Sequence, residues 1–539
     1  MTWQTGTSTD HIDLLNQLRE IATSDHVSAV VVNAGGTGYV VGDILTVAGG
    51  TSTHTATIEV LTVSTGAVAT VRIKTGGAYT ADPTLTANAV TGGTGSSCTL
   101  DLTMTATGWT VVRESEEVTA AAINSGGTGY TVNDVLTVVG GLGDGVTDAV
   151  VAATITVDTV SSGVITAVTV TTGGHYEEPI SPTTAVTVTG GTGTGATFDL
   201  TFAVLTDAEK ILVMEGTAGG AGDDVTVAIK TFNTASGFNT AYNWMLLGLQ
   251  DFSAALTLQD QSNVSPGLAT SGSGPVVVTE DTTQGAYVPL KDDDGFPMDF
   301  WFSITDRRIV GVVKLETAII THYASFYLGF LNQFGTAAER PYPIYVSGCQ
   351  SRYNAFFADA APKLMSGITE LYGGSSEDGP GWYRRHSSSA WVEVRNGGHT
   401  ESSGTRAIST GDGHLYPTGK PDVQPTGADR IVADNADFDW QEMIQMGSAV
   451  SPVLELRETP GSPDDVRPLI PCAVLYTDGT APGDFEIQGE LDNVFWTSIA
   501  GGSPSVGSED SFAFDGDVYS IFQNGNRANV YSFMVIKED

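Results

Sequence analysis

An internal duplication places the strongest constraint on the fold of this chain. The segment VNAGGTGY at residues 32–39 recurs as INSGGTGY at 123–130, and both copies continue into a similar stretch, DILTV or DVLTV. Further along, TGGAY matches TGGHY, and TGGTG occurs in both copies. The whole unit is therefore repeated, with about 75 to 90 residues in each copy.

Each copy has the texture of β-structure. Short runs of Val, Ile and Thr, such as residues 57–61 and 164–170, are separated by pairs of glycines, which is typical of strands joined by tight turns. The GGTGY run is not a phosphate-binding loop, because no lysine and no helical pattern follow it. The repeats predict two small all-β modules, at residues 29–107 and 118–204.

The sequence around the repeats predicts that the modules are insertions in a host domain. Residues 108–113 and 210–216 lie outside the repeats and have the pattern of strands that pair once the second module is removed. Residues 224–230 and 242–247 are further expected strands. Residues 1–28 and 108–117 then form the N-terminal part of the host domain, with one short helix that follows the capping residues 8–10 and ends near Thr23.

Aromatic residues become frequent after residue 205, as in FWF at 300–302 and YASFYLGF at 323–330. Side chains of this size require a substantial core. We therefore expect an aromatic-rich β body at residues 205–350 and a C-terminal β-rich region at 351–539. The expected fold is mainly β and multidomain: a sandwich-like or barrel-like body, two inserted small all-β modules and one short N-terminal helix.

Composition narrows the function classes. The 539 residues carry 62 acidic and 23 basic side chains, a formal net charge of −39, which argues against nucleic acid as a partner. Three cysteines, Cys98, Cys349 and Cys472, match neither a disulfide framework nor a metal motif. No apolar run is long enough for a membrane helix, and the first residues lack the pattern of a signal peptide, so the product is expected to be cytoplasmic until it assembles.

Several motifs of the body resemble tail-associated structural proteins of tailed bacteriophages. They are WF at 301–302, RRIVGVV at 307–313, YLGFL at 327–331 and PYPIYV at 341–346, with QTGT at 4–7, DLL at 13–15, DNVFW at 492–496 and YSIFQN at 519–524 near the two ends. This likeness covers residues 1–28, 108–115 and 205–539. The Gly-Thr-Gly-Tyr modules separately resemble modules that recur in phage fibres and other virion appendages.

From the sequence we assign no residue to catalysis, cofactor binding or metal binding. The acidic candidates are Asp292–Asp294, Glu377 with Asp378, and Asp434, Asp437 and Asp439 around Trp440; solvated turns are the preferred interpretation, and loop calcium sites are the alternative. His386 is assigned to a solvated loop. The run GWYRR at 381–385 has the composition of a sugar-binding or partner-binding surface, although core or interface packing is favoured.

The sequence and the resemblance together predict a non-enzymatic structural protein of the virion. Its station is left open among tail, neck or collar, baseplate and tail fibre. The expected partners are further copies of the chain, in a ring or trimer, other tail proteins and, as an open alternative, a host surface glycan; no nucleic acid and no membrane span are expected. The alternatives are a receptor-binding or glycan-binding tail fibre protein and, less favoured, a tail-spike depolymerase.

Overall fold

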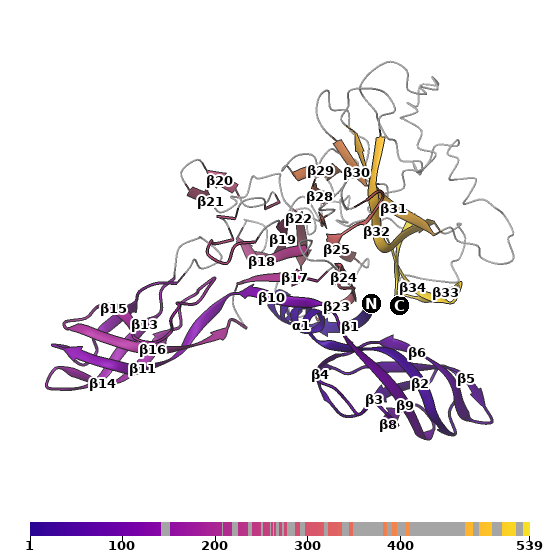
Figure 1. Cartoon of the computed structure of the whole chain (residues 1–539), viewed down its shortest axis with the longest axis horizontal. Helices are drawn as coiled ribbons and strands as arrows, with labels where there is room; N and C mark the ends of the chain where they lie inside the picture. Colours follow the sequence, from indigo (N-terminus) through magenta and orange to yellow (C-terminus); the bar gives the residue numbers. More distant parts are fainter. Residues whose placement is uncertain are drawn as a thin grey trace, which may run out of the picture.

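The computed structural model describes residues 1–141, 151–206, 209–217, 225–235, 240–249, 252–258, 260–261, 264–265, 269–271, 274–276, 286–290, 297–316, 322–336, 344–348, 381–384, 391–395, 406–409, 469–477, 485–498, 509–523 and 532–538. These residues are mainly β, with one helix among them, which confirms the predicted fold class. Figure 1 shows a central body from which two β modules extend, one towards the left and one towards the lower right.

The body contains two large sheets. The first has the order β1 (Thr2–Ser8), β23 (Met298–Ile304), β24 (Arg308–Glu316), β25 (His322–Phe330), β27 (Ile344–Ser347), β28 (Gly381–Arg384), β29 (Trp391–Arg395), β30 (Arg406–Ser409), β31 (Ile470–Thr477), β32 (Phe485–Ser498), β35 (Ser532–Lys537), β34 (Asp517–Gln523) and β33 (Ser511–Phe514), with β26 (Asn332–Gln333) beside β32. The second has the order β10 (Trp109–Glu114), β17 (Ile211–Gly216), β18 (Val225–Ala235), β19 (Thr240–Leu249) and β22 (Ala286–Leu290). A short hairpin, β20 (Ala269–Ser271) and β21 (Gly274–Val276), stands apart from both.

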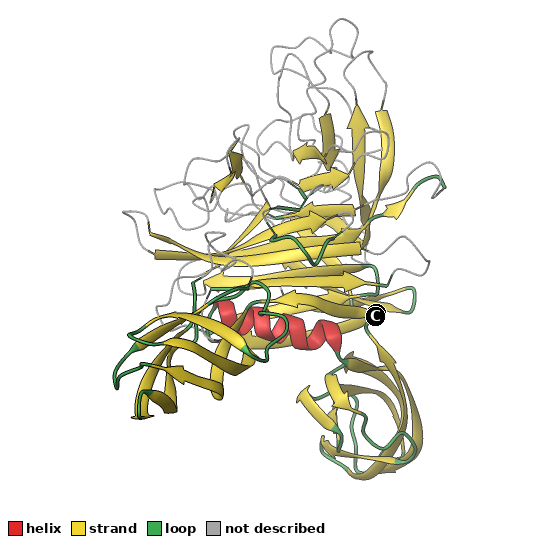
Figure 2. Cartoon of the chain, turned by 60° about the vertical axis from the view of Figure 1, so that its left-hand side comes forward, coloured by secondary structure: helices red, strands yellow, loops and turns green. Residues whose placement is uncertain are grey.

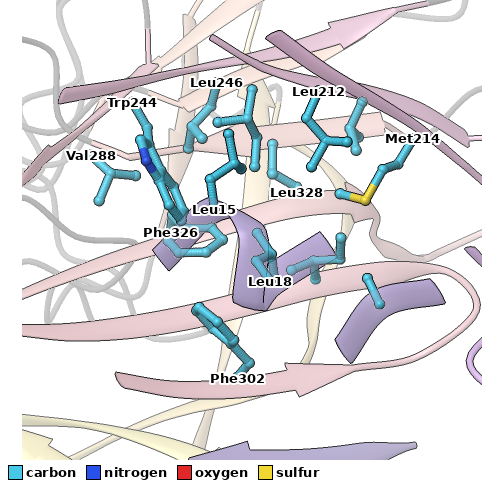
Figure 3. Packing of buried hydrophobic residues seen from close by; sticks show 14 of the residues in the cluster. Leu15, Leu18, Leu212, Met214, Trp244, Leu246, Val288, Phe302, Phe326 and Leu328 are labelled. Carbon is cyan, nitrogen blue, oxygen red and sulfur yellow. The ribbon is translucent and has the colours of Figure 1, made fainter. Parts of the chain in front are cut away.

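Helix α1 (His11–Thr23) lies beside the edge strands β1 and β10 of these two sheets and packs its apolar face into the core that they share (Figure 2). The helix begins where predicted because the Asp10 carboxylate accepts hydrogen bonds from the backbone N–H groups of Ile12 and Asp13, both at 2.8 Å. Its apolar residues recur at helical spacing and are fully buried. Figure 3 shows Leu15 and Leu18 of the helix packed among Leu212 and Leu246 of one sheet and Phe302, Phe326 and Leu328 of the other.

The predicted pairing of the segments that flank the second repeat is confirmed. Strand β10 lies antiparallel to β17, with Trp109 opposite Gly216 and Glu114 opposite Leu212. The next two expected strands, β18 and β19, continue the same sheet. Residues 305–307 form the turn that connects β23 to β24, and the hydroxyl of Thr305 accepts hydrogen bonds from the backbone N–H groups of Arg307 and Arg308.

The two repeats form separate β structures with separate cores. Module 1 is the sheet β4 (Thr51–His54), β7 (Ala78–Ala81), β2 (Asp25–Thr37), β9 (Ser96–Ala106), β8 (Asn88–Gly92), β3 (Ile44–Val47), β5 (Thr57–Ser64) and β6 (Ala67–Thr75). Module 2 is the sheet β11 (Glu116–Thr128), β16 (Thr194–Val204), β15 (Val186–Gly190), β12 (Val135–Val138), β13 (Thr154–Ser161) and β14 (Val164–Thr172). Each encloses its own buried apolar cluster.

The two ends of each module lie next to each other on the body. Asp25 is paired with Ala106 across β2 and β9, and Glu116 is paired with Val204 across β11 and β16. Beyond the second pair, the backbone N–H of Leu205 donates to the carbonyl of Ser115 at 3.0 Å. An insertion whose ends are already adjacent leaves the host connection undisturbed, so each module can be gained without rebuilding the body.

Candidate functional site: two repeated modules fixed to the body

The GGTGY motif forms the end of each module that lies away from the body. Strand β2 starts beside the body at Asp25 and runs for 13 residues to Thr37, directly before the Gly-Tyr pair. The backbone N–H of Tyr39 donates to the carbonyl of Gly66 in the β5–β6 turn at 2.9 Å, and Tyr130 makes the same bond to Gly163 at 3.0 Å. The motif therefore connects neighbouring loops at the far end of the module.

A tyrosine packed on a glycine holds these loops together. The rings of Tyr39 and Tyr130 are each only 3% exposed. A Cβ atom on Gly95 would lie 2.5 Å from the Tyr39 ring, and one on Gly193 would lie 2.5 Å from the Tyr130 ring. Any side chain at either glycine would displace the buried ring. Within each module, the TGGTG segment is therefore the surface on which the tyrosine of the GGTGY motif packs.

A repeated aspartate completes the far end. In module 2 the Asp134 carboxylate accepts hydrogen bonds from the backbone N–H groups of Thr131 and Thr192, both at 2.9 Å, and from the Thr192 hydroxyl at 2.7 Å. Asp43 accepts the corresponding bonds from Val40 and Thr94 in module 1. The backbone N–H donors lower the pKa of Asp134 to about 2 and also lower that of Asp43, so both carboxylates stay ionised.

Module 1 is joined to the N-terminal strand of the body and to its C-terminal strands. The backbone N–H of Gly76 donates to the carbonyl of Trp3 at 3.0 Å, which attaches the module to β1. The Arg72 guanidinium contacts Glu59 of the same module at 2.7 Å and Glu538, directly after β35, at 2.8 Å. Glu538 also accepts from the Ser520 hydroxyl of β34 at 2.8 Å. The arginine thus links the module to the C-terminal strands of the body.

Module 2 is held by an arginine of the body. The Arg113 guanidinium on β10 contacts Glu177 at 2.9 Å and Glu178 at 2.7 Å, both from the module. The side chains of Arg113 and Glu177 are 2% and 1% exposed, so this pair is shielded from water. Arg113 also donates to the carbonyls of Ala254 and Leu256, each at 2.6 Å, and its charge lies 4.9 Å from the centre of the Phe252 ring.

A second buried ion pair lies at the junction between α1, β10 and β17. The Glu114 carboxylate contacts Arg19 of the helix and Lys210, directly before β17, both at 2.7 Å. The Lys210 ammonium is fully buried and also donates to the Leu205 carbonyl at 3.0 Å. Burial lowers the pKa of Lys210, while the adjacent Glu114 carboxylate opposes the shift and favours its charged form. The chain therefore enters and leaves module 2 beside a fixed charge pair.

The root of module 1 contains a histidine that should make its stability depend on pH. His26 is 3% exposed, and burial lowers its pKa to about 4. Between about pH 6.5 and 4 the unfolded chain binds a proton that the folded chain does not, so the free energy of unfolding falls as the pH is lowered, by roughly 3 kcal/mol at most. Hydrogen exchange of β2 amides measured against pH checks this.

The control for that experiment is His26→Leu, which keeps an apolar side chain of similar size. The variant should lose most of the acid sensitivity of module 1, and module 2, which has Glu117 at the equivalent position, should be unaffected in both proteins. An unchanged pH profile in His26→Leu would assign the acid sensitivity to other groups, of which His54 is the first to test because burial lowers its pKa too.

The sites proposed from the sequence are not brought together by the described part of the chain. The acidic runs around Asp292, Glu377 and Asp434 lie outside the described residues, as do His386 and Cys349. Residues 381–384 form β28, but their side chains are not described. Cys98 is a buried free thiol whose pKa is raised by burial. Among the described residues, no group of three His, Cys, Asp or Glu side chains is arranged to hold a metal ion.

The residues that fix the modules were not identified from the sequence. Asp43 and Asp134 could have been found from the sequence, because an aspartate occupies the same position in both copies of the repeat. The buried cations Arg113 and Lys210 gave no such signal, since each stands beside acidic residues in the sequence and has the look of an exposed charge at the edge of an apolar strand.

The comparisons with known proteins add no family. No family model matches the chain, and no curated protein matches its sequence. In the described residues there is also no helix long and apolar enough to cross a membrane.

Proposed function

We propose that the chain is a non-enzymatic structural component of a tailed-phage virion that assembles as a symmetric oligomer and presents its two modules outward. The observation that carries the proposal is the presence of two copies of one β-module, inserted in successive connections of one body and each attached through an arginine ion pair. An arrangement of this kind presents surfaces at fixed positions. The resemblance of the body to phage tail proteins supplies the virion context.

The geometry of the modules supports outward presentation. Each module extends away from the body in Figure 1, and its far end is formed by the loops of the repeated motif. The contacts with the body lie at the opposite end and use residues that differ between the copies, such as Arg72 in module 1 and Glu177 in module 2. The residues that contact the body thus differ between the two modules, whereas the loops at the outer ends have the same motif and the same hydrogen bonds in both.

Mass photometry of the whole chain and of a variant without modules tests the proposal. Residues 25–106 and 116–204 are each replaced by Gly-Gly, because the ends left behind are already adjacent. Arg113→Met is added, since its carboxylate partners are removed with module 2. We expect the same closed oligomer from both proteins, and labelling of the tail in phage particles by antibodies against the modules.

Two results would contradict the proposal. A whole chain that stays monomeric at every concentration would remove the symmetric assembly. A whole chain that assembles while the variant does not would place the modules in the assembly interface, and the outward arrangement would then be wrong. Circular dichroism of the variant separates this second result from simple loss of the fold, because a folded body keeps its β signal.

A further inference from the structure

A cavity of about 410 Å³ lies where module 1 meets the body. The last turns of α1 line one side through Arg19, Glu20 and Thr23, and Asp25, at the start of β2, follows directly. The module lines the other side through Thr53 and the β7 residues Tyr79 and Thr80. Its volume falls within the range of about 300 to 1,000 Å³ that small-molecule sites occupy in proteins.

The polar groups of this cavity include donors and acceptors that the fold leaves unused. Arg19 contacts Glu114 through Nε, at 2.7 Å, and no described residue accepts a hydrogen bond from its two terminal nitrogens. The carboxylates of Glu20 and Asp25 accept no hydrogen bond from a described residue either. The threonine hydroxyls add groups that both donate and accept.

The charges of the lining select the class of ligand. Glu20 and Asp25 together repel an anion such as a phosphate or a uronic acid. The guanidinium in turn disfavours a cation in the same space. A neutral molecule that carries several hydroxyl groups satisfies both constraints, because its hydroxyls donate to the carboxylates and accept from the guanidinium.

We infer that this cavity is a binding site for a neutral saccharide unit, of one or two rings. Tyr79, which is 1% exposed, closes the floor of the cavity, while the exposed threonines leave the mouth open to a longer glycan chain. In the described part of module 2 the corresponding place is taken, because Glu177 replaces Thr80 at the same repeat position and is bound by Arg113. One site is expected in each chain.

Isothermal titration of the whole chain tests the inference, with the methyl glycosides of glucose, galactose and N-acetylglucosamine and with maltose as probes. At least one should bind, with a dissociation constant near 1 mM, about what a few exposed hydrogen bonds provide. Glu20→Gln combined with Asp25→Asn keeps the shape of the cavity and should weaken that binding roughly tenfold. Thr80→Trp should abolish it by filling the mouth.

The matched control is Thr103→Trp, at an exposed position of β9 that does not line the cavity. This variant should bind like the unmodified chain. The inference fails if none of the four probes binds at about 50 mM, or if Thr80→Trp binds as well as Thr103→Trp. It also fails if calcium or putrescine binds and is lost with the two carboxylates, which would make the cavity a cation site.

The saccharide site does not depend on the proposed virion role. Absence of sugar binding would leave the result of mass photometry unchanged, and a monomeric chain would leave the titration unchanged.

Discussion

Glu177→Ala is expected to lower the free energy of opening of the module 2 root by roughly 3 to 5 kcal/mol. The substitution leaves the Arg113 guanidinium, 2% exposed, without its buried carboxylate. An arginine cannot escape this cost by losing its proton. The carboxylate also accepts a hydrogen bond from the backbone N–H of Leu258, so a second buried donor loses its partner. Hydrogen exchange of residues 173–178 and 252–258 measures the effect.

Glu178→Ala provides a matched control, because Glu178 contacts the same guanidinium at 2.7 Å but its side chain is 39% exposed. Water screens this pair, and its loss should change the free energy of opening by less than about 1 kcal/mol. Equal and small effects of the two substitutions would show that Arg113 does not stabilise the junction.

A double variant separates charge from packing. Arg113→Met combined with Glu177→Leu removes both charges and replaces them with apolar side chains, which often recovers the stability that a broken buried pair loses. Recovery would assign the effect of Glu177→Ala to the uncompensated guanidinium. Burial raises the pKa of Glu177, and Arg113 opposes that shift, so Arg113→Met alone should be milder, since the carboxyl can take up a proton.

The features that the sequence predicted are those that local pattern determines. The repeats were visible because turn glycines recur with their neighbours, and α1 because Asp10 precedes an amphipathic stretch. Pairing of β10 with β17 followed from the insertion itself, since two strands that flank an inserted unit are neighbours in the host. Each of these inferences needs only residues close in sequence or a copy of the same segment.

The contacts between the modules and the body could not be predicted, because the residues that form them are far apart in the sequence. Arg72 meets Glu538, a residue that no nearby pattern connects to it. The sequence placed the start of module 1 at residue 29, and strand β2 begins at Asp25. Residues 25–28 include polar side chains and lack the Val and Thr run of a strand, yet they pair with the end of β9. Tertiary pairing gives these residues the strand conformation that their own propensity does not.

Gly193→Ala should destabilise module 2 by about 3 kcal/mol, and Gly95→Ala should do the same to module 1. The new methyl group would lie 2.5 Å from the Tyr130 ring and 2.6 Å from the carbonyl oxygen of Thr128, so the buried ring and the loop backbone must both shift. Hydrogen exchange of the whole chain should show faster exchange only in the module that carries the substitution, and the other copy serves as an internal reference.

Gly195→Ala separates this clash from backbone strain. Gly195 has φ +78, and a Cβ there would meet no atom within 4 Å, so only the left-handed conformation is penalised, by roughly 1 kcal/mol. A similar loss from Gly193→Ala and Gly195→Ala would show that the tyrosine does not depend on the bare glycine surface. A larger loss from Gly193→Ala would establish that GGTGY and TGGTG persist in both copies as two halves of one packing contact, which holds the outer loops in one shape.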